Sequence, residues 1–282
     1  MADNIAVARD WPSNSILDCV QWMRYECAMN NKIKIMPCLD TQNGRVVKGV
    51  RFVDIKDAGD PVECCRAYCA AGADELALLD ITATIEGRQT MIDLVRRTAA
   101  VVTVPFTVGG GISDCSVAEA VLAAGANKIS TSSAAFRKPD VIAQMIREFG
   151  SDRVTVAIDA GANPALPSGY EVYIDGGRTA TGRDAIEWAK EVGDYGATTI
   201  LPTSKSTDGV RTGYDLPLIR GIKAVTQAEV VASGGAGTME HFHEAALAGA
   251  TVLLAASVFH FNVISIPSLK AFLRDRGLNV SL

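Results

Sequence analysis

The stretch PFTVGGGIS (residues 105–113) joins a short apolar run to three glycines, and VVASGGAGT (residues 230–238) repeats this pattern 125 residues later. Glycine allows close backbone approach and adopts dihedral angles that other residues avoid. Where a helix begins after such a turn, its free N–H groups form a site for an anion. The repetition predicts two related anion sites in one fold.

Eight short apolar runs follow one another along the chain, and a helical pattern follows each of them. The runs occupy residues 33–39, 75–81, 103–108, 127–131, 153–158, 198–203, 229–233 and 251–257. Their continuous apolarity is typical of parallel strands buried on both faces. Eight evenly spaced units predict a (β/α)8 barrel, with a doubly wound open sheet as the structural alternative. The alternation in YEVYIDGGRTATG (170–182) predicts a β-hairpin inserted after the fifth strand.

The ends of the predicted strands pair across the two halves of the chain. Asp40 ends the first strand and Asp159 the fifth, 119 residues later. The next three pairs, with offsets of 123, 125 and 125 residues, are Asp80 with Thr203, Gly109 with Gly234, and Ser132 with Ser257. Near-constant offsets over four elements predict an internal duplication, in which a half-barrel is repeated with pseudo-twofold symmetry. The two glycine loops then lie on opposite sides of one mouth.

The C-terminal ends of the strands hold the chemistry in such barrels, and a phosphate commonly binds after strands seven and eight. The phosphate site predicted there consists of Gly234, Gly235, Ala236 and Ser257. Its symmetry mate consists of Gly110, Gly111, Ser132 and Ser133. A tight turn alone would explain either loop. Two related loops, each beside a hydroxyl at the next strand end, favour a substrate with a phosphate at each end.

Asp40 and Asp159 end opposite strands, so we expect them to face each other between the phosphate sites. Paired carboxylates suit general acid–base catalysis, although one of them could instead accept hydrogen bonds from loop amides. Asp80 and Asp208 are further candidates, and an Asp-Gly turn would explain Asp208 without chemistry. Lys48, in the first loop, could reach a phosphate or a substrate oxygen, or remain solvated.

The composition narrows the class of protein. The chain has 282 residues, of which 48% are hydrophobic, and 27 basic against 32 acidic side chains give a net charge of −5. This mild acidity argues against binding to nucleic acid or a membrane surface. Seven cysteines without a CxxC motif indicate reduced thiols in a cytoplasmic protein. We recognise no signal peptide, membrane span, metal site, or nicotinamide or flavin fingerprint, and expect no cofactor.

The chain before the first strand reads as a separate segment. We predict an N-terminal extension over residues 1–31 and the barrel over residues 32–282. Residues 14–28 could form a short amphipathic helix. A frayed tail, or a true start at Met29, would explain the same segment.

Seven stretches spread over the barrel are specific enough to indicate a family. They are CLDTQNGRVVKG, LLDITAT, PFTVGGGI, VAIDA, DGVRTGYD, ASGGAGTMEHF and LAASVFHF. Over roughly residues 32–280 the chain resembles the cyclase subunit of imidazole glycerol phosphate synthase, an enzyme of histidine biosynthesis. The resemblance implies a substrate with two phosphates, phosphoribulosyl-formimino-aminoimidazole-carboxamide ribonucleotide (PRFAR). It also implies ammonia delivered through the barrel by a glutaminase docked on the N-terminal face. The products would be imidazole glycerol phosphate and aminoimidazole carboxamide ribonucleotide (AICAR).

The resemblance also implies roles for individual residues. Asp159 would manage protons during ammonia addition and cleavage, Asp40 would act as acid or base in ring closure, and Lys48 would close over the substrate. One phosphate site would use Gly111, Ser132 and Ser133. The other would use Gly209, Gly235, Ala236 and Ser257, with Asp208 and Gly234 in the same loops. Where the family usually has Asn-Thr, this chain has Ser132 and Ser133, which can still donate hydrogen bonds.

Other departures from the family pattern lie at both ends of the barrel. Lys205 and Ser206 stand where an apolar residue and an aspartate are expected, and Lys205 could add positive charge near the mouth or be solvated. The charged ring that gates ammonia passage resembles Lys34, Glu75, Lys128 and Thr199. Thr199 stands where a glutamate is usual, Lys34 where an arginine is usual, and Asn127 where an interface aspartate is usual. These changes predict weaker coupling to the glutaminase.

Three other functions remain as alternatives. The related phosphoribosyl isomerase of the same pathway shares the repeat, but GYD, MEHF and AASVFHF favour the cyclase. A paralogous amidotransferase subunit with another substrate would not be expected to keep CLD and both phosphate sites. A partner that only activates a glutaminase would have no reason to keep both aspartates and both glycine loops.

Overall fold

The computed structural model describes residues 31–281, apart from residues 51–52, 82 and 84–91; over residues 48–50 and 53–58 it describes the backbone alone. Nearly all of the predicted N-terminal extension lies outside the described residues, so its conformation stays a prediction. In the part of the chain that the structure describes, no helix combines the length and the apolarity that crossing a membrane requires.

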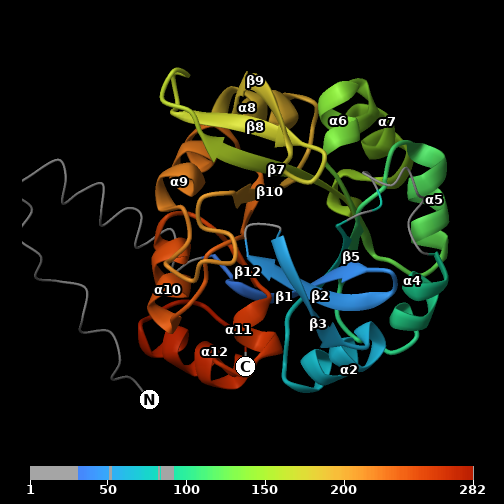
Figure 1. Ribbon diagram of the computed structural model, residues 1–282, viewed down its shortest axis with the longest axis vertical. Helices are drawn as coiled ribbons and strands as arrows, with labels where there is room; N and C mark the ends of the chain where they lie inside the picture. The colour runs from blue at the N-terminus through green and yellow to red at the C-terminus, as the bar shows by residue number, and fades with distance from the viewer. Residues whose placement is uncertain (1–30, 51–52, 82, 84–91, 282) are drawn as a thin grey trace, which may run out of the picture.

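Eight parallel strands of the described chain close into a barrel, which excludes the doubly wound open sheet (Figure 1). In chain order they are β1 (Lys34–Gln42), β4 (Leu76–Asp80), β5 (Phe106–Gly109), β6 (Lys128–Thr131), β7 (Val154–Ala162), β10 (Thr199–Ser204), β11 (Glu229–Ala232) and β12 (Val252–Ala255). Each strand pairs with the next, and the barrel closes where Lys34 of β1 is in register with Val252 of β12. The predicted fold is confirmed.

Helices surround the barrel on all sides (Figure 1). The longer ones are α2 (Pro61–Ala70), α4 (Ile92–Ala99), α5 (Cys115–Ala123), α7 (Asp140–Phe149), α8 (Ala185–Asp194), α9 (Leu216–Val225), α10 (Met239–Leu247) and α12 (Ile266–Asp275). Asp60, Asp114 and Asp184 cap α2, α5 and α8, and each carboxylate accepts hydrogen bonds from two backbone N–H groups of the first turn. Such caps satisfy donors that a helix leaves unpaired at its start.

Alternation along the strands divides the core into two regions. Ile35 and Leu39 of β1 belong to the larger region, which lies between the barrel and the helices. The smaller region fills the barrel itself with Met36, Cys38, Ala77, Leu201, Val231, Val252 and Leu254. Because successive side chains of a strand point to opposite faces, the even-numbered residues of β1 point into the barrel.

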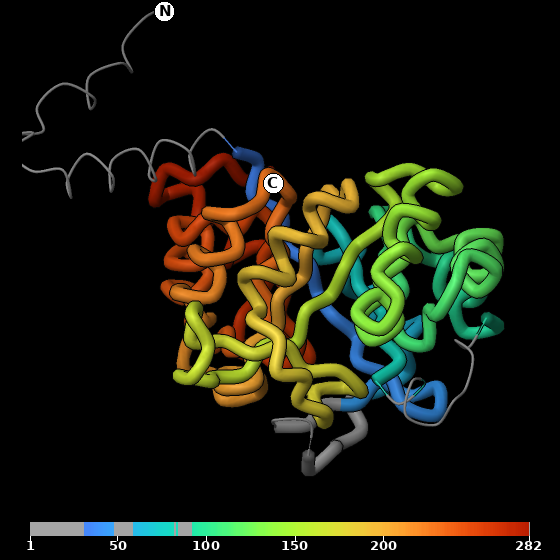
Figure 2. Tube along the Cα trace, turned by 90° about the horizontal axis from the view of Figure 1, so that it is seen from above, coloured from blue at the N-terminus to red at the C-terminus, as the bar shows by residue number. Residues whose placement is uncertain are grey.

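Two hairpins extend the barrel at equivalent places in its two halves. The predicted one, β8 (Tyr170–Ile174) and β9 (Thr179–Asp184), pairs antiparallel with the end of β7. A second one, β2 (Arg45–Val50) and β3 (Val53–Gly59), pairs with the end of β1. The sequence analysis placed Lys48 in the first loop and did not predict this second hairpin. Figure 2 shows the start of β1 and the C-terminus at one end of the barrel and the β8–β9 hairpin at the other.

The repeat also extends to the connections after the fourth strand of each half. The short helix α6 (Ser133–Arg137) follows β6, and the short helix α11 (Ser257–His260) follows β12. A longer helix, α7 or α12, comes next in each half. The duplication thus places Ser132 and Ser257, the predicted phosphate-site hydroxyls, at equivalent strand ends.

Candidate active site

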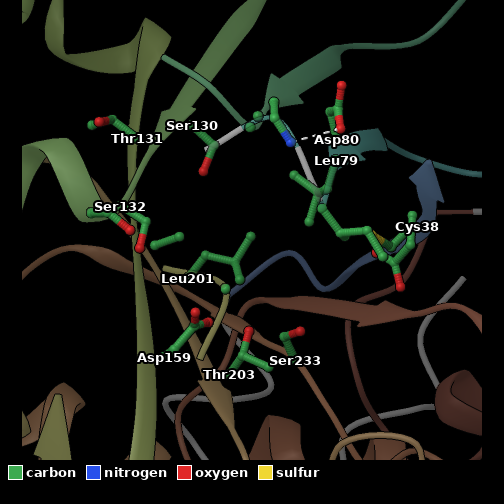
Figure 3. Close-up of a pocket in the computed structure, with 18 of the residues that line it drawn as sticks. Cys38, Leu79, Asp80, Ser130, Thr131, Ser132, Asp159, Leu201, Thr203 and Ser233 are labelled. Carbon is green, nitrogen blue, oxygen red and sulfur yellow. Dashed lines mark hydrogen bonds between the residues drawn. The ribbon is translucent and has the colours of Figure 1, made fainter. Parts of the chain in front are cut away.

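A cavity of about 630 Å³ opens at the C-terminal ends of the barrel strands. All eight strands contribute to its lining, in or directly after each strand, with Asp40, Asp80, Gly109, Ser132, Asp159, Thr203, Ser233 and Ala256. Its floor is apolar and includes Cys38, Ala157 and Leu201 from the barrel interior. Figure 3 shows Asp159 and Thr203 together, across the cavity from Cys38 and Asp80. A polar mouth over an apolar floor suits a small polar substrate.

The two predicted catalytic aspartates lie on opposite walls of this cavity. Asp40 is on β1 and Asp159 on β7, and in the barrel order four steps separate these strands in either direction. Both side chains are partly buried. The thiol of Cys38 donates a hydrogen bond to Oδ1 of Asp40, with Sγ and Oδ1 3.4 Å apart. The structure therefore brings together the pair that the strand ends predicted.

The surroundings of Asp159 favour its protonated form. Burial and the nearby carboxylate of Asp208 raise its pKa to about 7, against an opposing effect of the Lys205 ammonium. A carboxyl group that titrates near neutral pH can both take up and release a proton under physiological conditions. Asp159 therefore has the property that a proton-transfer group needs.

The first glycine loop and its hydroxyl partners line one side of the cavity. Gly110 and Gly111 have φ angles of +94° and +72°, in the region that favours glycine. Ser132 and Ser133 follow β6 beside this loop. The hydroxyl of Ser133 accepts a hydrogen bond from the backbone N–H of Asp175, at 2.9 Å, in the turn of the β8–β9 hairpin. The structure thus brings together the residues of the first predicted phosphate site, and Ser133 joins them to the hairpin.

The second glycine loop lines the opposite side. Gly234, Gly235, Ala236 and Ser257 all face the cavity, as do Asp208 and Gly209 from the loop after β10. The hydroxyl of Thr207 donates to the carbonyl oxygen of Gly234 at 3.1 Å, which ties these two loops together. The structure therefore also brings together the residues of the second predicted phosphate site.

Two arginines that the sequence analysis missed lie beside these clusters. Arg211 lines the cavity beside the second cluster, and its Nε donates to Oγ of Ser257 at 3.1 Å. Arg137 lines it beside the first, and its guanidinium binds both carboxylate oxygens of Asp175 at 2.7 Å. Guanidinium groups recognise phosphate well. Arg137 lies one turn after Ser133, and Arg211 lies within the DGVRTGYD motif. These positions were the signal that could have revealed both residues.

Lys205 is half-buried beside the cavity, where it contacts the β8–β9 hairpin. Its ammonium lies 3.5 Å from the ring centroid of Tyr173 on the β8–β9 hairpin. Burial lowers the pKa of Lys205, and the carboxylates of Asp159 and Glu171 oppose that change. Lys205 therefore adds a positive charge next to the candidate proton-transfer group.

Two expectations concern residues at the edge of what the structure describes. The backbone of Lys48 belongs to β2, but its side chain lies outside the described part of the chain, so its role stays a prediction. Across the described ranges, no group of three or more His, Cys, Asp or Glu residues is placed to hold a metal ion.

The residues predicted to form the ammonia gate lie at the other end of the barrel. The Lys34 ammonium is 2.7 Å from Glu75, and the Lys128 ammonium is 3.1 Å from the same carboxylate. Thr199 is buried at the start of β10. Asn127 accepts a hydrogen bond from the backbone N–H of Phe106 at 2.9 Å and so supports the start of β5. The apolar interior of the barrel separates these residues from the cavity.

Comparison with known proteins agrees with this architecture. The model of the family described as "Histidine biosynthesis protein" matches residues 34–265. Three relatives share the name imidazole glycerol phosphate synthase subunit HisF. The one from Gluconacetobacter diazotrophicus is 51% identical over 88% of this chain and 96% of its own length. Those from Pyrobaculum aerophilum and Mycobacterium tuberculosis are 50% and 47% identical, over 90% and 88% of this chain and 100% and 94% of their own lengths. The chain therefore belongs to the histidine biosynthesis family and, within it, to the group of imidazole glycerol phosphate synthase subunits named HisF.

Proposed function

We propose that this protein converts PRFAR and ammonia into imidazole glycerol phosphate and AICAR, as the cyclase subunit of imidazole glycerol phosphate synthase. The observation that carries the proposal is one cavity with a glycine–serine cluster on each side and an aspartate on each wall between them. This arrangement fits an extended substrate with a phosphate at each end and its reacting atoms in the middle.

The two clusters bind the phosphates of the substrate. In the first, Gly111, Ser132 and Ser133 supply backbone and hydroxyl donors, and Arg137, paired with Asp175, lies beside them. In the second, Gly235, Ala236 and Ser257 do so together with Arg211. Anchoring both ends orients the reacting centre and reduces the entropy that is lost at the transition state. The β2 lysine Lys48 closes over the bound substrate.

The aspartates transfer the protons of the reaction. Asp159, with a pKa of about 7, accepts and returns protons while ammonia adds to the substrate and the AICAR part is cleaved off. Asp40, on the opposite wall, acts as acid or base when the imidazole ring closes. Lys205 keeps a useful fraction of Asp159 ionised at neutral pH, because its charge opposes the effect of burial.

Ammonia reaches the cavity from a partner. The relatives are named as a subunit of a synthase, which supports a second subunit in the complex. We infer that this partner is a glutaminase docked on the N-terminal face, where Lys34, Glu75, Lys128 and Thr199 gate the entry of ammonia into the barrel. This is the end opposite the substrate cavity.

Turnover of PRFAR with ammonium at mildly alkaline pH, without the partner, tests the proposal. We expect activity in the wild type and a loss of about 100-fold or more in Asp40→Asn and Asp159→Asn, as for other general acid–base residues. Asp152→Asn, an exposed aspartate on the turn before β7, is the matched control and should retain full activity. Wild-type protein that neither binds nor turns over PRFAR would show that the cavity serves a different substrate.

A further inference from the structure

Glu229 lies at the same end of the barrel as Lys34, Glu75 and Lys128. It is the first residue of β11, as Lys34 is of β1 and Lys128 of β6, and Glu75 directly precedes β4. Glu229 stands two residues before Val231, which belongs to the interior of the barrel. Because strand side chains alternate between faces, Glu229 shares the inward face with Val231. We use "basal ring" for these four residues: Lys34, Glu75, Lys128 and Glu229.

The basal ring forms one continuous chain of alternating charges. The carboxylate of Glu75 forms ion pairs with the ammonium groups of Lys34, at 2.7 Å, and of Lys128, at 3.1 Å. Lys34 also reaches Glu229, at 2.8 Å. The ammonium of Lys34 is thus held from two sides. Two lysines and two glutamates balance, so a chain of ion pairs with no net charge crosses the end of the barrel.

Glu229 takes the place of the carboxylate that the sequence lacks at Thr199. The two residues are register partners on the neighbouring strands β10 and β11. Adjacent strands lie about 4.8 Å apart, a gap that the side chain of a glutamate can span. A carboxylate moved by one strand therefore still reaches Lys34.

The surroundings of Lys34 stabilise its ion pair with Glu229. Burial alone would lower the pKa of the Lys34 ammonium, but hydrogen bonds and charge interactions with Glu229 and Glu75 raise it above its ordinary value. Lys34 therefore stays protonated. The side chain of Glu75 is 6% exposed, and those of Lys34 and Glu229 are 24% and 25% exposed, so Glu75 is the inner and Glu229 the outer anchor.

We propose that Glu229 is a positioning residue that holds Lys34 across the N-terminal end of the barrel and so controls the entry of ammonia there. The inference rests on the function proposed above. It replaces the expectation of weaker coupling, because the ring keeps two carboxylates although Thr199 is uncharged. The barrel interior beyond the ring is apolar, so uncharged ammonia can cross it, whereas an ammonium ion would lose its hydration at high cost.

The test compares two rates in each variant: turnover of PRFAR driven by glutamine with the glutaminase subunit, and turnover driven by ammonium alone. In Glu229→Gln and Glu229→Thr we expect the ratio of these rates to fall by about fivefold or more, the range typical of coupling between sites. Thr199→Glu/Glu229→Thr moves the carboxylate back by one strand, and we expect it to recover most of the ratio. Glu191→Gln, which breaks a 2.7 Å surface pair with Arg183, should leave the ratio unchanged.

The outcomes separate this inference from the function on which it rests. An unchanged ratio in Glu229→Gln, in a wild-type background that uses ammonium, would overturn the role of Glu229 alone. A lowered ratio that the relocated carboxylate fails to recover would also overturn it, since a carboxylate that holds Lys34 from either strand should restore the ratio. Wild-type protein without ammonium-driven turnover would overturn the proposed function itself.

Discussion

Gly110 and Gly235 occupy equivalent places in the two halves of the barrel, and each is pressed against a backbone carbonyl. Their φ angles are +94° and +108°. A Cβ on Gly110 would lie 2.2 Å from the carbonyl oxygen of Asp80, and one on Gly235 would lie 2.0 Å from that of Gly213. Rotation of a side chain cannot relieve such contacts. Both glycine loops are therefore fixed in shape against a neighbouring strand-end loop.

Gly235→Ala should therefore impair both stability and substrate binding. We expect a loss of more than about 2 kcal/mol in the free energy of unfolding, because strain at positive φ and a backbone clash combine. We also expect the KM for PRFAR to rise about tenfold or more as the loop shifts. Denaturant unfolding and steady-state kinetics measure the two effects.

Gly72→Ala is the matched control for this variant. Gly72 also has a positive φ, of +84°, but a Cβ there would meet no atom within 4 Å. It should cost only the roughly 1–2 kcal/mol of the left-handed conformation and leave the KM unchanged. Equal effects of the two variants on the KM would show that the close approach of Gly235 to Gly213 does not shape the site.

Asp159→Asn should stabilise the protein above about pH 4 while lowering its activity by about 100-fold or more. The carboxyl of Asp159 has a pKa of about 7 in the folded protein, against about 3.9 for an unperturbed aspartate. Below pH 4 it is protonated in both states and contributes nothing. As the pH rises to 7, the unfolded state alone loses this proton, which favours unfolding by up to about 4 kcal/mol. An asparagine cannot ionise and avoids this cost.

Denaturant unfolding of Asp159→Asn and of the wild type at several pH values checks the direction of this stability change. The advantage of the variant over the wild type should be small near pH 4, grow up to pH 7 and then level off. Asp152→Asn, at an exposed position, should show no such trend. An advantage that does not depend on pH would mean that the substitution acts through packing rather than through ionisation.

Lys205→Met should shift the pH dependence of catalysis. The Lys205 ammonium lowers the pKa of Asp159, so its removal lets burial and Asp208 raise that pKa further. If ionised Asp159 is the active form, the acidic limb of the pH profile of kcat/KM moves to higher pH, by roughly 0.5 pH units or more. Lys205→Arg keeps the charge and should leave the limb in place. An acidic limb at the same pH in both variants would contradict an effect of Lys205 on Asp159.

The sequence predicted most of the fold because its signals are periodic. Buried parallel strands read as apolar runs, and the duplication repeated each strand end at a near-constant offset. Asp40, Asp159 and both glycine loops were found in this way, since the end of a barrel strand fixes where a side chain points. The β2–β3 hairpin was missed because RVVKGV and VDIKDAG mix charged and apolar residues and resemble a loop.

Other features depend more on spatial neighbours than on a local pattern. Arg137 ends the short helix α6 and Arg211 lies in the loop after β10, and both reach the cavity. Glu229 was missed because the family pattern places the corresponding carboxylate at position 199. That a carboxylate on the next strand reaches Lys34 follows from the strand register and from side-chain length, both of which only the folded barrel specifies.

Arg211→Gln should weaken binding of the substrate without changing its chemistry. The guanidinium of Arg211 lies in the cavity beside Ser257, where it can neutralise a phosphate. We expect the KM for PRFAR to rise roughly tenfold, as for loss of one charge-assisted hydrogen bond, with kcat changed less than about twofold. The KM should also become less sensitive to salt, because one fewer charge attracts the phosphates. Arg97→Gln, which removes a charge from an exposed pair with Asp93 on α4, controls for net charge. A KM that rises equally in both variants would point to long-range attraction rather than to contact at the second phosphate cluster.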